Sequence, residues 1–514
     1  MDGSQSLASD PRRTPSPPAG RSRRRPFVAM RSLLRVVLLA HLLAASLAGA
    51  GAAQVRPVRL ATGPGDVHFS QSAARLPDGR FAAVWTQGRT ALLQYVDSNG
   101  TVAFGAPGRT VATAPVAGSE ALVVAHARDG VLVAVRRRLD EDNSRILVQW
   151  LDGHGNPRWG AGTYAAPVAG REDQLDPFLL ASSDGGGFVC FTRVASDNLD
   201  RRALYCQRFS PEGQRLWGTR GARGSLSPLR AEEPKAVAAG DGGLLVFWRD
   251  WGWVADDDPK VFLRGQRLGP DGVRRWGDDG TIVFKNRFFC DDGCALDSPW
   301  ISAVSDGADG AILAFDDRSG RLPIGTSLNH VTAQRMSASG ERLWGEGVSV
   351  LPSRPPQALF ELFAHPDGGA VVAVITFPFD FFVDGGFHMV LQRLAVDGRP
   401  LWPAEGIPVV DPTSSPDRLY EGPIFGSVDD GVLRIAWERS NPRSRLPSEI
   451  RFSAFDAAGN RLTPGDGVPL IRPVVPSRNG DALIRGFAFD PASGTSFVVW
   501  EGAGDAAAVL YAPR

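Results

Sequence analysis

Two stretches decide the fold: Gln207-Arg-Phe-Ser-Pro-Glu-Gly-Gln-Arg-Leu-Trp217-Gly and Gln266-Arg-Leu-Gly-Pro-Asp-Gly-Val-Arg-Arg-Trp276-Gly. In both, a glutamine and a tryptophan stand ten residues apart, with a glycine-containing turn between them. The same spacing from Gln to an aromatic residue recurs along the chain: Gln94 with Phe104, Gln149 with Trp159, Gln334 with Trp344, and Gln392 with Trp402. A seventh copy carries Ser453 at the Gln position and Leu462-Thr463 in place of Trp-Gly. Six copies at one fixed spacing indicate an internal repeat.

Asp-Gly turns give an independent count of the units. Seven begin at Asp78, Asp129, Asp184, Asp241, Asp309, Asp367 and Asp430, and Ser493-Gly494 supplies an eighth. The segments that follow, such as 81–85 and 244–248, are almost continuously apolar, which is typical of strands buried on both faces. Each unit therefore holds four strands. The first strands are predicted near 67–76, 119–127, 175–182, 232–239, 298–304, 357–364, 419–428 and 482–489.

Four-stranded sheets of this kind predict a β-propeller. A lone sheet would expose two apolar faces and two edges, and packing such sheets around an axis buries the faces. We therefore predict an all-β chain with a single propeller at 54–514, of eight blades, or of seven if 474–514 packs differently. The last unit ends after its third strand, and the segment 55–60 resembles the tails of fourth strands. We expect 55–60 to complete the last blade and close the ring.

The first 53 residues predict export. Residues 1–29 are rich in Arg, Ser and Pro, and are interpreted either as a disordered, long n-region or as a mis-called start, with Met30 the initiator. Residues 30–53 read as a signal peptide: a basic start, an apolar stretch over 36–48, and small residues before Gln54. The apolar stretch is short for a membrane span, and no other long one exists. The predicted location is secreted or periplasmic, or the cell surface.

Charge and motifs exclude several functions. Without residues 1–53 the chain carries 48 basic and 54 acidic groups, which argues against nucleic acid and anionic membranes as partners. The sequence holds no nucleophile elbow, zinc-protease motif, phosphate loop or EF-hand loop. We therefore predict no cofactor, no metal site and no catalytic residue, and we expect a monomer.

Four cysteines in an exported chain predict two disulfides. Cys190 and Cys206 fall on the predicted second and third strands of blade 3, where a hairpin would place them opposite each other. Cys290 and Cys294 would staple the connection between blades 4 and 5. A zinc site is the alternative, but no His lies near either pair.

Function is predicted on one face of the propeller. The second-to-third loops and the connections between blades share that face and vary in length, and variable loops on a rigid scaffold usually carry binding. The blade 4 loop at 249–258 places two Trp beside three consecutive Asp at 256–258, which suits a sugar ring or a cation; otherwise the Trp cover the blade end. The blade 6 loop at 377–388 holds five Phe, for protein docking or for plugging the channel. The predicted ligand-binding residues are Trp251, Trp253, Asp256, Asp257, Asp258, Phe379, Phe381, Phe382 and His388.

The recurring side chains also have structural interpretations. We expect the Gln to bridge backbone groups between blades and the Trp to pack between blades. The turn at 211–217, with that at 339–344, resembles the tryptophan-docking motif of quinoprotein-type eight-bladed propellers. The whole of 55–514 resembles exported bacterial proteins with Gln-Arg-Leu, Asp-Gly and Trp-Gly repeats. The quinoprotein resemblance implies pyrroloquinoline quinone, calcium and often vicinal cysteines, and no adjacent Cys pair occurs here.

Three functions remain open from the sequence. The first is a non-enzymatic binding or scaffold propeller that contacts protein or glycan through its loop-rich face. The second is a propeller enzyme, either quinone-dependent or acting on polysaccharide. Glycosidic chemistry needs two carboxylates about 5–9.5 Å apart, for which Asp256 to Asp258 and Asp316-Asp317 are the candidates. The third is a purely structural surface protein.

Overall fold

The computed structural model describes strands and their connections, and no helix, within one compact unit, Ala53–Pro513. Among the described residues there is no helix that could cross a bilayer. The described residues are 54–60, 67–68, 72–126, 128–167, 170–195, 198–254, 258–286, 301–321, 327–353, 357–376, 388–410, 420–441, 446–471, 483–502 and 505–513.

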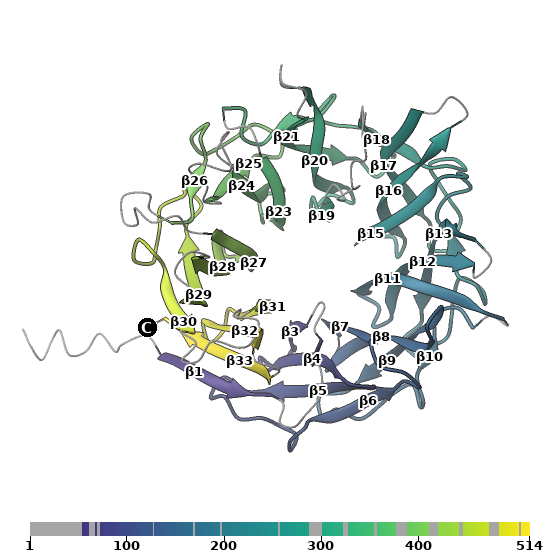
Figure 1. Ribbon diagram of the computed structural model, residues 1–514, viewed down its shortest axis with the longest axis horizontal. Coiled ribbons are helices and arrows are strands. Elements are labelled where there is room, and N and C mark those ends of the chain that lie inside the picture. Colours follow the sequence, from purple (N-terminus) through teal and green to yellow (C-terminus); the bar gives the residue numbers. More distant parts are fainter. Residues whose placement is uncertain are drawn as a thin grey trace, which may run out of the picture. The chain divides into compact units, whose positions relative to one another are not determined.

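The strands form eight antiparallel sheets, arranged as the blades of a propeller (Figure 1). Blade 1 holds β2 (Val67–His68), β3 (Ala73–Arg75), β4 (Phe81–Gln87), β5 (Thr90–Val96) and β6 (Arg109–Thr113). Blade 2 holds β7 (Glu120–Ala125), β8 (Val131–Asp140), β9 (Asn143–Leu151) and β10 (Thr163–Tyr164). Blade 3 holds β11 (Glu172–Ala181), β12 (Gly187–Ala195), β13 (Asn198–Phe209) and β14 (Ala222–Arg223). Blade 4 holds β15 (Arg230–Ala238), β16 (Leu244–Val254), β17 (Asp258–Leu268) and β18 (Thr281–Asn286).

The second half of the ring repeats this order. Blade 5 holds β19 (Ile301–Ser305), β20 (Ala311–Arg321), β21 (Ser327–Met336) and β22 (Val348–Ser349). Blade 6 holds β23 (Gln357–Ala364), β24 (Ala370–Thr376), β25 (His388–Leu394) and β26 (Ile407–Pro408). Blade 7 holds β27 (Tyr420–Asp429), β28 (Val432–Asn441), β29 (Leu446–Phe455) and β30 (Val468–Ile471). Blade 8 holds β31 (Leu483–Asp490), β32 (Thr495–Gly502), β33 (Asp505–Ala512) and the N-terminal β1 (Gln54–Arg59).

The last blade closes the ring as predicted. Strand β1 pairs antiparallel with β33, in a register that runs from Gln54 opposite Ala512 to Arg59 opposite Ala507. The eight-blade prediction is therefore confirmed, and the edge of β33 is covered by a strand from the other end of the propeller.

The core lies between neighbouring blades. One cluster of buried side chains joins Ile312 and Val331 of blade 5 to Val372 and Val390 of blade 6. Because both faces of each sheet meet another blade, strands such as β4 are buried along nearly their whole length. This explains the continuous apolar runs in the sequence.

The recurring tryptophans pack between blades, as predicted. The Trp217 indole donates a hydrogen bond to the carbonyl of Pro270 in blade 4 (3.0 Å), and its ring lies against Gly272. A Cβ at Gly272 would stand 2.8 Å from that ring, and its φ of 77° also favours glycine. The same donation to the next blade is made by Trp159, Trp276, Trp344 and Trp402.

The recurring glutamines mainly close their own turns, so the prediction that they bridge blades is wrong. The Gln207 amide donates to the carbonyl of Gly218 (2.7 Å) and accepts from the backbone N–H of Trp217 (2.9 Å), all within blade 3. The ten-residue spacing brings each glutamine beside the end of its own turn. Only Gln207, among the described glutamines of the repeat, also reaches the preceding blade, at the carbonyl of Ala165 (3.2 Å).

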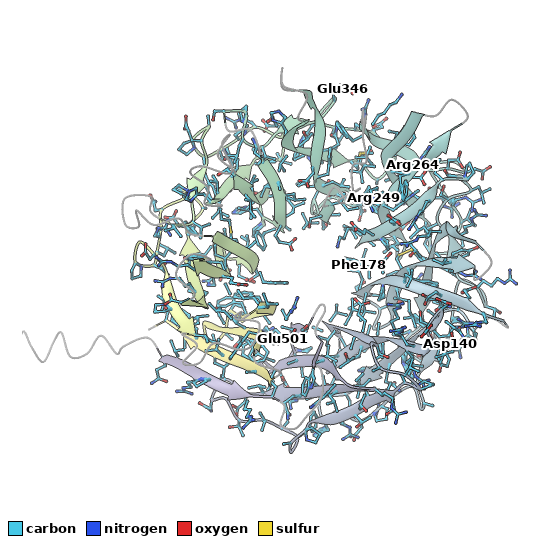
Figure 2. All side chains as sticks on the ribbon, viewed as in Figure 1. Asp140, Phe178, Arg249, Arg264, Glu346 and Glu501 are labelled. Atoms are coloured by element: carbon cyan, nitrogen blue, oxygen red, sulfur yellow. A yellow bond between two sulfur atoms is a disulfide. The ribbon has the colours of Figure 1, made fainter. Side chains whose placement is uncertain are left out.

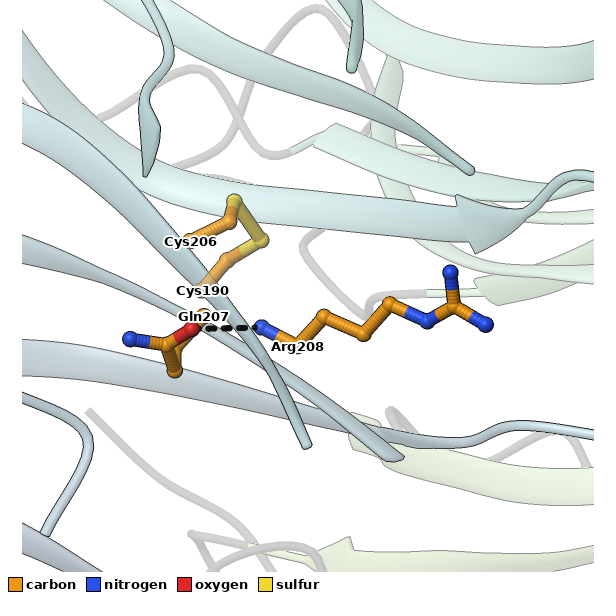
Figure 3. Close-up of a disulfide and its surroundings, with 4 residues drawn as sticks. All are labelled: Cys190, Cys206, Gln207 and Arg208. Atoms are coloured by element: carbon orange, nitrogen blue, oxygen red, sulfur yellow. Dashed lines mark hydrogen bonds between the residues drawn. A yellow bond between two sulfur atoms is a disulfide. The ribbon is translucent and has the colours of Figure 1, made fainter. Parts of the chain in front are cut away.

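The disulfide predicted in blade 3 is present. Cys190 and Cys206 stand opposite each other in the register of β12 and β13, and their sulfurs are bonded (Figure 3). Next to Cys206, the Gln207 side chain accepts from the backbone N–H of Arg208 (Figure 3). The predicted pair Cys290 and Cys294 lies outside the described residues.

Candidate functional site

A cavity of about 420 Å³ opens at the loop-rich end of blade 3. The β12–β13 hairpin connects its two strands at this end, where Ala195 pairs with Asn198. Lining residues of the cavity lie on both strands close to that turn. All four strands of blade 3 and the connection to blade 4 contribute to the wall: Glu172, Arg193, Arg202, Ala203, Tyr205, Arg223, Ser227, Pro228 and Leu229. The volume falls within the range of small-ligand sites.

Strand register sets the positions of the lining residues. Arg193 pairs with Ala203 across the β12–β13 hairpin, and Tyr205 pairs with Arg223 across β13 and β14. Side chains of directly paired residues lie side by side on one face of the sheet. Tyr205 and Arg223 are therefore neighbours, while Arg202, one residue from Ala203, leans to the other face.

Arg193 is fixed within the pocket by two partners. Its guanidinium forms an ion pair with Glu172 of β11 and lies 4.4 Å from the centre of the Tyr205 ring. Both side chains of the ion pair are mostly buried. A planar guanidinium stacked on an aromatic ring loses little freedom when it binds, so this part of the wall is preorganised.

Arg202 connects the pocket to a buried carboxylate in blade 4. Its guanidinium lies 2.9 Å from Glu232, which also pairs with Arg230 (2.6 Å) and Arg249. The Trp251 indole donates to the same carboxylate (2.9 Å). Arg249 lies on the inner side of blade 4 (Figure 2). The Glu232 carboxylate thus contacts three guanidinium groups and one indole.

The charge of Glu232 is maintained by these partners. Burial alone would raise its pKa, but the hydrogen bond and charge of Arg249, the hydrogen bond of Trp251 and the charge of Arg230 bring the pKa below its usual value. Glu232 is therefore ionised at neutral pH.

A second buried carboxylate supports the pocket wall. Asp250 accepts a hydrogen bond from the Ser227 hydroxyl (3.0 Å) and pairs with Arg264 of β17 (2.8 Å). The same Ser227 oxygen accepts from the backbone N–H of Leu229 (3.2 Å), so the connection 227–229 is tied to blade 4. Burial raises the pKa of Asp250.

Among the predicted binding residues, Trp251 is the one whose side chain the structure places near this pocket. It lies on β16, with Arg230 4.8 Å from its ring centre and its N–H on Glu232. The interpretation of 249–258 as a loop is wrong for the residues that the structure describes: β16 extends to Val254, which pairs with Asp258 of β17. Strand β16 can contain charged residues here because each has a partner. Glu232 pairs with Arg249 and accepts a hydrogen bond from Trp251, and Ser227 donates to Asp250.

The other predicted binding residues remain untested. Trp253 and Asp258 lie on strands, but their side chains are outside the described part of the chain. Five predicted residues lie entirely outside it: Asp256, Asp257, Phe379, Phe381 and Phe382. His388 begins β25 and is exposed.

The candidate carboxylate pair in blade 5 does not form a two-carboxylate site. Asp316 accepts from the backbone N–H of Leu359 in blade 6 (2.6 Å), and Asp317 accepts from Thr332 of β21 (3.4 Å). Neighbouring residues of a strand point to opposite faces of the sheet, so the two carboxylates cannot flank one bond. Within the described residues there is also no group of three or more His, Cys, Asp or Glu that could hold a metal ion.

The pocket arginines were not predicted. The chain has 56 Lys and Arg residues, and three of these are Lys, so single arginines carry little signal. The available signal was the presence of Arg193 and Arg202 within strands, where an uncompensated charge is costly. The spatial partners that explain them come from other strands and another blade.

No protein-family model and no curated protein matches this chain. The predicted resemblance to exported bacterial repeat proteins therefore stays a prediction. Among solved structures, the polysaccharide lyase Uly1 is 11% identical with a TM-score of 0.46, over 74% of this chain and 89% of that chain. A PL25 ulvan lyase is 11% identical with a TM-score of 0.42, over 88% and 95%. A Penicillium chrysogenum α-L-arabinanase complexed with arabinobiose is 14% identical with a TM-score of 0.35, over 63% and 93%. At these values the likenesses carry no argument about function.

Proposed function

We propose that this chain is an exported, non-enzymatic binding propeller that holds a glycan in the pocket of blade 3. The observation that carries the proposal is the concave site of about 420 Å³ at the loop-rich end, built on the strands of blade 3 and on the connection 227–229, which is tied to blade 4. A concave pocket of this size suits one or two sugar rings, whereas protein docking uses about 800 Å² of surface on each partner.

Export is supported by two features. Residues 30–53 have the pattern of a signal peptide, and Cys190 is joined to Cys206. Disulfides persist mainly in oxidising compartments outside the cytosol. The compartment in turn favours a ligand of the cell envelope or its surroundings.

The test is a glycan array probed with the full chain and with a variant whose pocket is filled. Ala203 lines the cavity, so Ala203→Trp places an indole in the space a sugar would occupy. We expect the wild type to bind a set of oligosaccharides and Ala203→Trp to lose that binding. The matched control is Ala404→Trp, at an exposed alanine of blade 6, which should bind like the wild type. An array with no bound oligosaccharide, or equal binding by Ala203→Trp, contradicts the proposal.

A further inference from the structure

The lining of the blade 3 pocket is unevenly charged. Among the lining residues that the structure describes, three arginines, Arg193, Arg202 and Arg223, stand against one carboxylate, Glu172. Glu172 is engaged by Arg193. Arg202 has Glu232 as its ion-pair partner, and that carboxylate is shared with two further arginines. The positive charge of these arginines is therefore not neutralised by the described residues of the lining.

Arg223 is the lining arginine with the fewest partners. Its guanidinium forms no ion pair with any described residue. Its Nε is buried and lacks a hydrogen-bond partner in the described part of the chain, and the same is true of the Nε atoms of Arg193 and Arg202. Arg193 and Arg202 are nevertheless ion-paired, which leaves Arg223 as the guanidinium beside the cavity without a charged partner among the described residues. Buried donors in native proteins are nearly always satisfied, so this guanidinium points to a ligand that accepts hydrogen bonds and carries negative charge.

The backbone around Arg223 is held in place. Arg223 follows Ala222 in β14, whose pairing with β13 sets the residue beside Tyr205. The Arg274 guanidinium of blade 4 donates to the carbonyl of Arg223 (3.2 Å), which fixes the strand from the other side. The side chain therefore starts from a fixed point next to the cavity.

Resting on the proposed glycan-binding function, we infer that the ligand is an acidic saccharide whose anionic group is bound by Arg223, the lining arginine that has no ion-pair partner among the described residues. A guanidinium presents a planar fork of donors that matches a carboxylate or a sulfate group, and this pairing is stronger than a neutral hydrogen bond. The arrangement of Arg193 on Tyr205 forms the wall against which the sugar ring lies. A neutral saccharide would leave the charge of the lining uncompensated.

The test measures binding of the full chain by calorimetry to pairs of saccharides that differ in charge. Oligogalacturonate is compared with its methyl ester, and dextran sulfate with dextran, so that the two arms separate carboxylate from sulfate. We expect one acidic member to bind at least tenfold more tightly than its neutral partner, and the binding to weaken as sodium chloride rises from 50 to 500 mM. Arg223→Gln should lose at least tenfold in affinity for that probe, and Arg223→Lys should recover part of the loss.

Arg399→Gln is the matched control, since that arginine is 71% exposed in blade 6 and far from the pocket in the chain. It should bind as the wild type does, and thermal melting should show that Arg223→Gln is folded. If the chain binds the charged and the neutral saccharides of a pair equally, and Ala203→Trp abolishes that binding, the inference of an acidic ligand is wrong. The proposed glycan-binding function would then still stand. Acidic binding that persists unchanged in both Arg223 variants would overturn the role of the pocket arginines. Absence of binding to all four probes overturns the acidic ligand, and the glycan array then decides the proposed function separately.

Discussion

Replacing Glu232 by glutamine tests whether one carboxylate organises the site. Glu232→Gln keeps the shape of the side chain and removes the charge that holds Arg202, Arg230 and Arg249. The arginines would stay in place with their charge uncompensated. Because the pocket wall at Arg202 depends on this carboxylate, the substitution perturbs both the stability of blade 4 and the geometry of the cavity.

The magnitude follows from burial. Removing one partner of a buried ion pair costs about 3–5 kcal/mol. The Glu232 side chain is 8% exposed, but those of Arg202 and Arg230 are 25% and 19% exposed, so water screens part of the charge they would retain. We therefore expect the lower end, about 3 kcal/mol. For a unit the length of Ala53–Pro513, at about 2.1 cal/mol/K per residue, this lowers Tm by about 3 °C if the unit unfolds in one step.

The pH dependence provides a sharper signature. The pKa of Glu232 is lowered in the folded protein relative to its usual 4.5, so its stabilising contribution is complete above about pH 4.5. The contribution is lost as pH falls through the lower, folded-state pKa. The difference in unfolding free energy between wild type and Glu232→Gln should therefore be constant from pH 7 to pH 5.5 and shrink below pH 4.5. Other carboxylates titrate in both proteins and cancel in the difference.

The assay is urea unfolding followed by tryptophan fluorescence across this pH range. The control is Glu346→Gln, the same substitution in an ion pair with Arg342, where the carboxylate is 88% exposed. Exposed pairs contribute little, so we expect a change of about 0.5 kcal/mol or less. The reasoning is refuted if Glu232→Gln behaves like Glu346→Gln, or if its deficit is as large at pH 3.5 as at pH 7.

Two further predictions concern the ring. Gly398→Ala should cost about 2–4 kcal/mol, because a Cβ would stand 2.8 Å from the Trp344 ring and φ is 85°. Gly345 also has a positive φ but no atom within 4 Å of an added Cβ, so Gly345→Ala should lower the free energy of unfolding by only about 1–2 kcal/mol. Equal urea midpoints for the two variants would contradict the packing of the tryptophan on Gly398. Deleting residues 54–60 should expose the edge of β33 and produce oligomers in light scattering, and a monomer as stable as the parent chain would show that β1 is dispensable for closure.

The sequence predicted what local spacing determines. The ten-residue interval between Gln and Trp and the Asp-Gly turns placed all eight first strands close to their observed positions, and the fourth-strand likeness of 55–60 identified the closing strand. The opposition of Cys190 and Cys206 followed from the length of one hairpin. These features depend on residues that are near in the chain or repeat at a fixed period.

The pocket could not be predicted in the same way, because its residues are related by register and by contact between blades. Strand β15 shifts register between Glu232 and Lys235, where Glu233 has a φ of 53°. Such a bulge adds a residue and changes which side chains face the neighbouring blade, so period-two alternation does not reveal the orientation of Glu232. Arg249 to Val254, rich in charge and Trp, also has the composition of a loop although it forms a strand.

The pocket lies where several strands are long. Strands β13, β16 and β17 have 12, 11 and 11 residues, against seven for β4 and β5 of blade 1. The additional residues extend toward the loop-rich face and carry Arg202, Arg249 and Trp251. Their side chains are held by Glu232, and the hairpin below them is joined by the blade 3 disulfide. A site built on paired strands is held more rigidly than one built on loops. The cost of burying these charges is therefore borne in the unbound protein, and a saccharide bound as proposed would meet side chains that are already held in position.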